Sequence, residues 1–195
     1  MRELCAIVLA AGLSRRAAPQ HKLLLPAPDG SARTVVRATV EAICGAAPAF
    51  REIVVVTGHE RARIESALTG LPVRFVFAEE FALGMGHSLA AGVRACVQDV
   101  AGVIVAPGDL PALRPELVTR VARVAADHAF ARHVIPTAQG RRGHPVFLSA
   151  SLRPALGELT GDAGARTLLA RAEERARTDL LELGDEAILR DVDTA

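Results

Sequence analysis

A short segment near the N-terminus carries residue types that bind phosphate. Residues 9–16 read Leu-Ala-Ala-Gly-Leu-Ser-Arg-Arg, and Lys22 follows. A turn of small residues lets backbone N–H groups approach a triphosphate, and the cations Arg15, Arg16 and Lys22 can neutralise its oxygens. The segment lacks the Gly-Lys-Ser/Thr of a Walker A loop and the three glycines of a dinucleotide fingerprint. On spacing alone, an alanine-rich turn with solvated arginines is an equally good interpretation.

Lys22 is the only lysine in a chain whose lysines and arginines together number 23, and the chain has no Asn. Such a bias indicates that Lys has been replaced by Arg wherever charge alone matters. A lysine that remains needs a compact ammonium on a flexible stem, which Arg cannot mimic. We therefore expect Lys22 to have a chemical role.

Asp109 is the second residue whose position indicates chemistry. It follows the apolar run 103–106 and the dipeptide Pro107-Gly108. A carboxylate at the end of a buried strand is well placed to hold Mg²⁺ against nucleotide phosphates. A single Asp is also common as the cap of the turn that follows it.

These residues require elements that bring them together, and the chain alternates between strand and helix patterns. Continuous apolar runs of this kind are typical of a mostly parallel sheet covered on both faces. Ligands then lie beyond the carboxyl ends of the strands, so the loops after the first, fourth and fifth strands should converge on one site. Strands are expected at 4–9, 53–56, 73–77, 103–106, 133–136 and 145–148 around a turn at 139–143, with short strands ending the chain, and helices at 34–44, 60–69, 87–97, from 115 and at 163–176.

The composition excludes several classes of protein. The 195 residues are 50% hydrophobic with a net charge of +1 and 3% aromatic residues, which predicts one folded domain over 1–195 and argues against a nucleic-acid partner. No stretch is apolar enough to span a membrane, and the acidic Glu3 argues against a signal peptide. Cys5, Cys44 and Cys96 are far apart in apolar surroundings, so we expect buried small hydrophobes without a metal-ligand pair, in a cytoplasmic protein.

Six segments in order resemble the MobA-like nucleotidyltransferase family, and within it most closely the molybdenum cofactor cytidylyltransferases. The first has the pattern Leu-Ala-Ala-Gly-x-Ser-x-Arg, then five residues, then Lys and an apolar Leu-Leu-Pro-like segment. Together they run from residue 9 to 194, which is nearly the whole chain. The resemblance implies a Rossmann-like three-layer α/β/α fold of the nucleotide-diphospho-sugar transferase (GT-A-like) type. The segments are residues 9–26, 84–89, 108–111, 142–147, 161–166 and 191–194.

The resemblance also implies roles for individual residues. Lys22, Arg16 and Asp109 would be catalytic, with Asp109 and Asp193 as metal ligands, although Asp191 shares a strand face with Asp193 and competes with it. The implied nucleotide-binding residues are Leu9, Ala10, Ala11, Gly12, Ser14, Arg15, Arg16, Lys22, Gly84 and Ser88. The implied acceptor-binding residues are Arg142, Gly143, His144, Asp162 and Arg166.

Three of these assignments have structural alternatives of similar weight. His144 suits a general acid or base, but a hydrogen-bonded structural histidine fits its position equally well. Residues 161–166 read as an anion-receiving loop or as a turn that caps a helix. Residues 84–88 are a flexible loop at the nucleotide or a tight connection between two elements.

The implied reaction moves CMP from CTP to a phosphorylated acceptor, with Mg²⁺ bound and pyrophosphate released. The first loop has Ala10-Ala11-Gly12, as in relatives that use CTP, whereas guanylyltransferases tend to have Ala-Gly-Gly. The acceptor implied by the resemblance is molybdopterin, a phosphorylated pterin, and a molybdenum hydroxylase apoenzyme would then be a partner. Two departures from the family pattern are Ala17-Ala18 in place of Met-Gly and His21 in place of Asn.

Three other functions are compatible with this sequence. A guanylyltransferase or another NTP transferase would act on a different phosphorylated metabolite. A reductase that uses NAD(P)H or flavin lacks the expected Gly-x-Gly-x-x-Gly loop. A carrier that holds a molybdenum cofactor without catalysis is favoured only by Ala17-Ala18.

Overall fold

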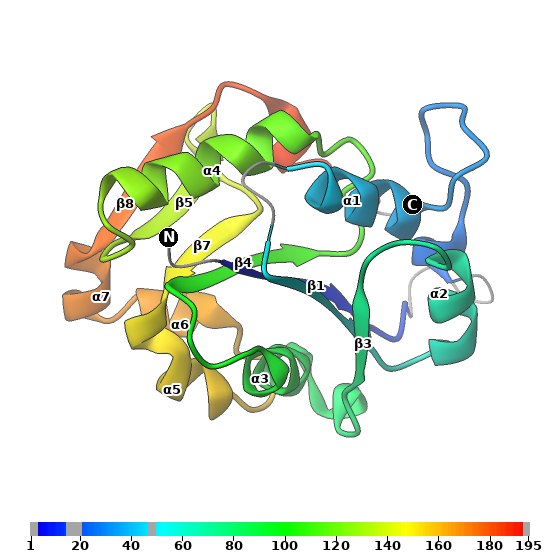
Figure 1. Ribbon diagram of the computed structural model, residues 1–195, viewed down its shortest axis with the longest axis horizontal. Helices are drawn as coiled ribbons and strands as arrows, with labels where there is room; N and C mark the ends of the chain where they lie inside the picture. Colours follow the sequence, from blue (N-terminus) through cyan, green and yellow to red (C-terminus); the bar gives the residue numbers. More distant parts are fainter. Residues whose placement is uncertain (1–3, 15–20, 47–49, 193–195) are drawn as a thin grey trace.

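A single sheet runs through the centre of the molecule (Figure 1). The computed structural model describes residues 4–14, 21–46 and 50–192. Within these residues the sheet has eight strands in the order β3-β2-β1-β4-β7-β5-β6, and β8 pairs with β5. The strands are β1 (Cys5–Ala10), β2 (Glu52–Thr57), β3 (Arg74–Phe77), β4 (Gly102–Pro107), β5 (His133–Ala138), β6 (Arg141–Arg142), β7 (Val146–Ser149) and β8 (Thr178–Glu182).

The sheet is mostly parallel, as its continuous apolar strands predict. The four strands β3, β2, β1 and β4 are parallel neighbours, and β5 and β8 are also parallel. Strand β7 runs antiparallel to both β4 and β5 and joins the two parallel parts. Since the carboxyl ends of β1, β3 and β4 lie at one edge, the loops that follow these strands are brought to the same side of the sheet.

Helices cover both faces of the sheet, which confirms the three-layer α/β/α architecture (Figure 1). Among the described residues, no helix has the length and apolar character needed to cross a lipid bilayer. One face carries α1 (Val35–Cys44), α2 (Arg61–Ala67) and α4 (Pro115–Asp127), and the other carries α3 (Met85–Ala95), α5 (Arg153–Gly157) and α6 (Ala165–Leu169), with α7 (Ala172–Ala176) following α6.

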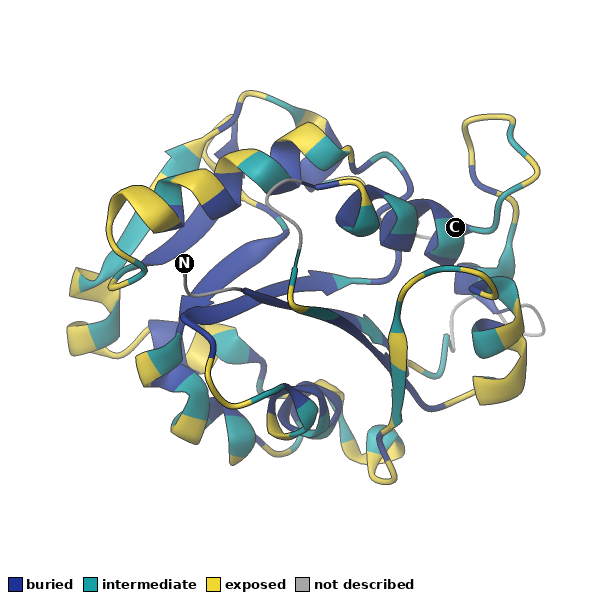
Figure 2. Cartoon of the chain, in the orientation of Figure 1, coloured by how far each residue is buried: buried dark blue, intermediate teal, exposed yellow. Residues whose placement is uncertain are grey.

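Each face of the sheet has its own apolar core. In β1, Ala6 and Val8 point to the core under α1, α2 and α4, whereas Cys5 and Ile7 point to the core under α3, α5 and α6. This alternation follows from the two-residue period of a strand. Figure 2 shows the inner strands of the sheet, β1, β2, β4, β5 and β7, as the most continuously buried part of the molecule. The buried sheet is therefore a rigid support for the loops at its edge.

The expectation of one helix over 163–176 is wrong. The chain instead forms α6 and α7, separated by Ala170 and Arg171, and Arg171 has an extended backbone with φ −61° and ψ 142°. After the break, Glu174 accepts a hydrogen bond from Nε2 of the buried His133 at 2.8 Å. The hydroxyl of Thr178 donates to the Glu174 carbonyl at 2.7 Å. These two hydrogen bonds hold the chain against strands β5 and β8 and thereby compete with continuation of the helix. Helix propensity, which depends on local sequence, does not predict such long-range contacts.

The turn expected at 139–143 also contains more structure than predicted. Arg141 and Arg142 form the short strand β6, which pairs antiparallel with Thr137 and Ala138 at the end of β5. Gln139 and Gly140 have positive φ angles of 52° and 73° and reverse the chain between the two strands. A tight two-residue reversal of this kind is typical of a β-hairpin.

The cysteines do not all behave as separate hydrophobic residues. Cys5 at the start of β1 and Cys96 after α3 are both buried, and their sulfur atoms and a carboxylate oxygen of Glu52 lie within 4.8 Å of one another. The hydrogen bond with Cys96, together with burial, raises the pKa of the Cys5 thiol. The fold therefore brings Cys5 and Cys96, which the sequence separates, close enough to each other and to Glu52 to be candidate ligands of one metal ion.

Candidate functional site

A cavity of about 370 Å³ lies at the carboxyl edge of the parallel strands. It is bounded by the loops after β1 and β4 and by the segment 81–88, which includes the 3-10 helix η3 (Phe81–Leu83) and the start of α3. Most of the residues predicted to bind nucleotide line this cavity: Leu9, Ala11, Gly12, Ser14, Lys22, Gly84 and Ser88. Asp109, predicted as a catalytic residue and metal ligand, lines it too. Ala10 is fully buried in the core and is not part of the lining.

The loop after β1 is closed by hydrogen bonds between its two ends. Ser14, with φ 50°, accepts a hydrogen bond at its hydroxyl from the backbone N–H of Lys22 at 2.8 Å. Nε2 of His21 donates to the Gly12 carbonyl at 3.0 Å. The next turn is the 3-10 helix η2 (Lys22–Leu24), which buries Leu23 in the core. These contacts set the position of Lys22. Arg15, Arg16, Ala17 and Ala18 lie outside the described residues.

Lys22 and Asp109 form an ion pair inside this cavity. The Lys22 Nζ atom lies 2.5 Å from Oδ2 of Asp109, although 87 residues separate them in the chain. Asp109 is only 8% exposed, and its second oxygen, Oδ1, is buried without a hydrogen-bond partner among the described residues. A buried carboxylate oxygen that lacks a partner is costly unless a cation or a donor reaches it. The arrangement therefore fits the prediction that Asp109 binds a divalent cation.

The C-terminal segment passes directly beside Asp109. The backbone N–H of Val192 donates to the Asp109 carbonyl at 3.1 Å. Asp191 is exposed and described, whereas Asp193 lies outside the described residues. Its assignment as a second metal ligand stays a prediction.

The side chain of Thr39 forms hydrogen bonds with the loop that carries Asp109. This residue was not identified from the sequence. Its hydroxyl, fully buried in α1, lies 3.1 Å from the Gly108 carbonyl and 3.2 Å from the Val35 carbonyl, to which it can donate. It also accepts from the backbone N–H of Leu110 at 3.0 Å. Both peptide units that flank Asp109 are thus tied to one side chain. The only sequence signal was a polar residue on the apolar face of a predicted helix.

We expect Thr39→Val to destabilise the protein by about 1–3 kcal/mol, because it leaves the Leu110 N–H and the Gly108 carbonyl buried without this partner. Urea denaturation measures the free energy of unfolding. Thr39→Ser keeps the hydroxyl and should lose much less. Little or no loss in Thr39→Val would contradict the role given to the hydroxyl group.

One side of the cavity is lined by apolar residues that were not identified from the sequence as part of the site. They are Phe81, Ala82, Leu83 and Met85. Leu83 and Met85 are 62% and 52% exposed, which is unusual for large apolar side chains. Apolar side chains beside a polar anion site are suited to cover a ligand's flat or apolar part.

A second cavity, of about 990 Å³, adjoins the first. Leu9, Met85 and Asp162 line both cavities, so the two are direct neighbours. The second is bounded by the loop after β5, by β6 and by the segment that leads into α6. All the residues predicted to bind the acceptor line it: Arg142, Gly143, His144, Asp162 and Arg166. The loops after the first, fourth and fifth predicted strands therefore converge as expected.

His144 is held by its backbone and is near enough to Asp109 and Asp191 for their charges to act on its side chain. Its N–H donates to the Ile188 carbonyl at 3.0 Å, and its Nδ1 atom is buried without a hydrogen-bond partner among the described residues. Burial lowers the pKa of His144, against the opposing effects of the Val105 carbonyl, Asp109 and Asp191. The side chain is therefore neutral at pH 7.

We expect the stability of the protein to fall as the pH drops below about 6.5, the ordinary pKa of histidine. In this range the unfolded chain binds a proton at His144, whereas the folded chain, with its lowered pKa, binds one only at lower pH. Acid therefore favours unfolding. The measurement is the urea midpoint at about pH 7.5 and about pH 5.5. His144→Gln should reduce the difference between the two midpoints, and an unchanged difference would contradict the assignment.

Comparisons with known proteins agree with this geometry. Residues 6–177 match the MobA-like NTP transferase domain. The chain is 32% identical, over 96% of its length and 91% of the relative's, to nicotine blue oxidoreductase of Paenarthrobacter nicotinovorans. It resembles the solved structure of a nucleotidyl transferase from Methanothermobacter thermautotroptrophicus with a TM-score of 0.80 and 29% identity, covering 97% of this chain and 91% of that one.

A further solved structure shares the fold. Rv0371c of Mycobacterium tuberculosis in complex with manganese has a TM-score of 0.70 and 24% identity, covering 93% of this chain and 87% of that chain. The family match spans most of the chain and includes the first loop, the Asp109 loop and both cavities. The protein belongs to the family of the MobA-like NTP transferase domain and is a nucleotidyltransferase.

Proposed function

We propose that this protein transfers CMP from CTP to a phosphorylated acceptor, with molybdopterin as the acceptor and pyrophosphate as the leaving group. The observation that carries the proposal is the pair of adjoining cavities, which share Leu9, Met85 and Asp162 in their linings. The first contains the ion pair between Lys22 and Asp109, and the second contains Arg142 and Arg166. This arrangement suits two anionic substrates that meet at one reacting phosphorus atom.

In the proposed reaction an oxygen of the acceptor phosphate forms a bond to the α-phosphorus of CTP. The bond from that phosphorus to the bridging oxygen breaks, and the bridging oxygen leaves with pyrophosphate. Lys22 stabilises the negative charge that accumulates on the phosphates, and Ser14 orients Lys22 through its backbone N–H. Arg16, by its motif position, would add a second positive charge.

The unpartnered Oδ1 atom of Asp109 supports binding of Mg²⁺ at this carboxylate, with Asp193 as the proposed second ligand. When bound, Mg²⁺ neutralises phosphate oxygens and orients them. Asp109 is held in place for this task by its own loop, whose peptide groups bind Thr39 and Val192.

The choice of CTP rests on the first loop, where Ala11 is among the residues that line the cavity and takes up more room than Gly would beside a purine base. The choice of a pterin acceptor rests on the size of the second cavity, about 990 Å³, and on its arginines. A molybdenum hydroxylase apoenzyme is the partner that this product implies. The cytoplasm is the proposed compartment, since CTP is available there and thiols stay reduced.

A reductase that uses NAD(P)H is the second candidate, because one relative over nearly the full chain is named nicotine blue oxidoreductase. The loop after β1 argues against it. Gly12 is the only glycine in residues 9–16, so the loop lacks the dinucleotide fingerprint that a nicotinamide cofactor would use.

The test measures the melting temperature of the purified protein with CTP, GTP, ATP or NADPH, each with and without Mg²⁺. A ligand that binds only the folded state raises this temperature. We expect a Mg²⁺-dependent rise with CTP that is lost in Asp109→Ala and in the more conservative Asp109→Asn. A rise with GTP alone would favour a guanylyltransferase, and a rise with NADPH alone would favour the reductase. A rise with a phosphorylated pterin, measured in the same way, together with no rise for any triphosphate, would favour the carrier.

A further inference from the structure

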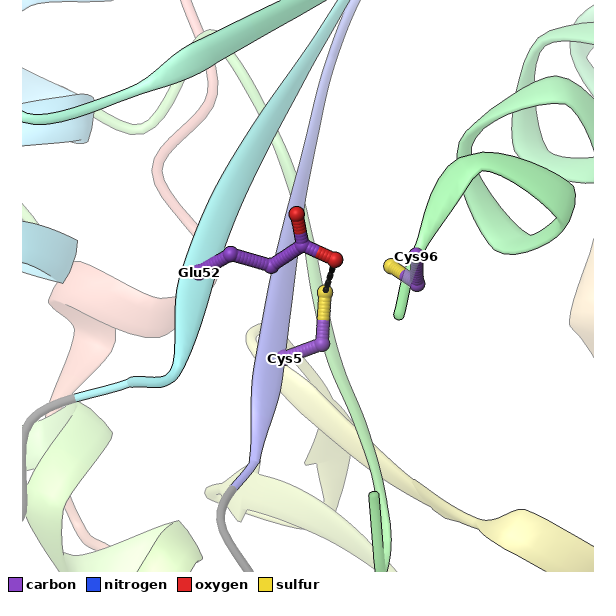
Figure 3. Close-up of side chains that lie close together, drawn as sticks. All are labelled: Cys5, Glu52 and Cys96. Atoms are coloured by element: carbon purple, nitrogen blue, oxygen red, sulfur yellow. Dashed lines mark hydrogen bonds between the residues drawn. The ribbon is translucent and has the colours of Figure 1, made fainter. Parts of the chain in front are cut away.

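Two thiols and a carboxylate converge at the edge of the sheet opposite the candidate site. Cys5 and Glu52 are cross-strand partners at the starts of β1 and β2, and Cys96 follows α3 (Figure 3). The Sγ atom of Cys5 lies 3.8 Å from Oε1 of Glu52, and one ligand atom from each of the three residues lies within 4.8 Å of the others. This cluster of Cys5, Glu52 and Cys96 is called the thiol cluster below.

The thiol cluster is independent of the candidate site. Cys5 is the first residue of β1, whereas the phosphate-binding motif begins at its last residues. The two groups are therefore separated by the length of a buried strand. A ligand bound at one would not touch the other.

The surroundings of the thiol cluster hold its groups in fixed orientations. Oε2 of Glu52 accepts hydrogen bonds from Nη2 of Arg74 at 2.7 Å and from Nε at 3.1 Å, and Oε1 accepts from the Val97 N–H at 2.5 Å. Nη2 of Arg153 donates to the Cys96 carbonyl at 3.1 Å. Ligands of protein-bound metals are commonly held by such outer hydrogen bonds.

We propose that Cys5, Glu52 and Cys96 bind a thiophilic metal ion, with Zn²⁺ as the ion that fits best. Tetrahedral zinc has bonds of about 2.3 Å to sulfur and about 2.0 Å to oxygen, which places ligand atoms roughly 3.5–3.8 Å apart. The Sγ–Oε1 distance of 3.8 Å between Cys5 and Glu52 is slightly longer than the sulfur–oxygen separation of about 3.5 Å in such a site, so binding needs only a small inward movement of these side chains. Two thiolates with a carboxylate are a donor set that selects zinc over magnesium or calcium.

Charge and proton balance also favour a divalent ion. Each thiol releases its proton to solvent when its sulfur binds the metal. The two thiolates and the Glu52 carboxylate then face Zn²⁺ and the guanidinium groups of Arg74 and Arg153, which lie at the cluster. The three negative charges of the ligands are thus balanced by the positive charges of Zn²⁺ and the two guanidinium groups, and buried charges need such compensation.

The ion would join three elements that are distant in sequence. It would link the starts of β1 and β2 to the turn that ends α3, on the face where α3 packs against both strands. Binding to the folded state alone would raise the melting temperature with increasing metal concentration. With three protein ligands, the fourth position of the tetrahedron would be taken by water, and the proposed role is to link these three elements at the base of the sheet.

The experiment uses Co²⁺ as a spectroscopic probe of the reduced full-length protein. Cobalt bound by thiolates has a sulfur-to-metal charge-transfer band that cobalt bound at a carboxylate site lacks. We expect one equivalent of Co²⁺ to produce this band and Zn²⁺ to abolish it. Cys5→Ser and Cys96→Ser should lose the band, whereas the matched variant Cys44→Ser, which changes the cysteine outside the thiol cluster, should keep it.

Two more variants test whether loss of the band comes from misfolding and whether the band itself comes from Co²⁺ bound at the candidate site. Arg74→Gln removes the guanidinium from Glu52 without changing a thiol and should weaken Co²⁺ binding by about 10- to 100-fold. Asp109→Asn should retain the full band, because Asp109 lies outside the thiol cluster. Absence of the band in the unmodified protein, its retention in both thiol-cluster serine variants, or formation of a disulfide between Cys5 and Cys96 in place of metal binding would overturn the proposal.

Discussion

Lys22→Ala is expected to lower the turnover of the transferase by at least about 100-fold, the usual effect of removing one preorganised electrostatic group. Lys22 is the only lysine of the chain, and its Nζ atom lies 2.5 Å from Asp109 in the first cavity. No other lysine can replace it. The measurement is the rate of pyrophosphate release from CTP in the presence of the acceptor at saturating concentrations of both.

Two controls separate this effect from a loss of folding. Removal of Lys22 leaves the Asp109 carboxylate without its ion pair, so the melting temperature of each variant is measured without substrate. Lys22→Arg keeps the positive charge but replaces a compact ammonium by a planar guanidinium, and we expect it to restore little of the rate. Arg33→Ala removes a guanidinium that pairs with Asp29 and Glu41 at the surface and should have nearly normal turnover. Near-normal turnover in Lys22→Ala would refute the catalytic assignment.

Gly84→Ala is expected to lower the free energy of unfolding by about 3 kcal/mol or more. Gly84 has φ 133° and ψ 166°, a conformation that only glycine adopts readily. A Cβ atom there would lie 2.2 Å from the carbonyl carbon of Gly161 and 2.6 Å from the N atom of Asp162. Both neighbours are backbone atoms that cannot move aside as a side chain would. Overpacking and backbone strain each cost about 1–3 kcal/mol, and here they act together.

The matched control is Gly161→Ala, on the other side of the same contact. Gly161 also has a positive φ, of 60°, but a Cβ atom would meet no atom within 4 Å. This change costs only the left-handed backbone, about 1 kcal/mol. Urea denaturation measures both variants. Similar losses for Gly84→Ala and Gly161→Ala would contradict the close backbone contact.

The Gly84 contact also has a functional consequence. The Gly86 N–H donates to the Gly161 carbonyl at 2.8 Å, so the loop that lines the first cavity is joined to the loop that leads to the second. If Gly84→Ala folds at low temperature, we expect its KM to rise for both substrates. A change confined to one substrate would indicate that the two loops move separately.

The sequence by itself determined the layers of the fold and the two ends of the candidate site. Continuous apolar runs at 53–56 and 103–106 predict buried parallel strands, and both are found in β2 and β4. The motif with Lys22 and the Asp109 loop each follow such a strand. Because parallel strands end at one edge, their loops must lie near each other, and this conclusion needs no knowledge of any particular contact.

The tertiary structure decided which side chains meet. Thr39 reads as a polar residue of a helix, and only the packing of α1 under β4 brings its hydroxyl to the Asp109 loop. The break between α6 and α7 likewise follows from the contact between Glu174 and His133, 41 residues earlier in the chain. Local propensity does not record either contact, because both depend on long-range packing.

The thiol cluster shows the same limit most directly. Cys5 and Cys96 have no spacing that indicates a metal site, yet the fold places them together beside Glu52. Periodicity tells which face of a strand or helix is buried, but it does not tell which buried faces pack against each other. That pairing is set by the order of strands in the sheet and by the helix that crosses it, and it exists only once the chain has folded.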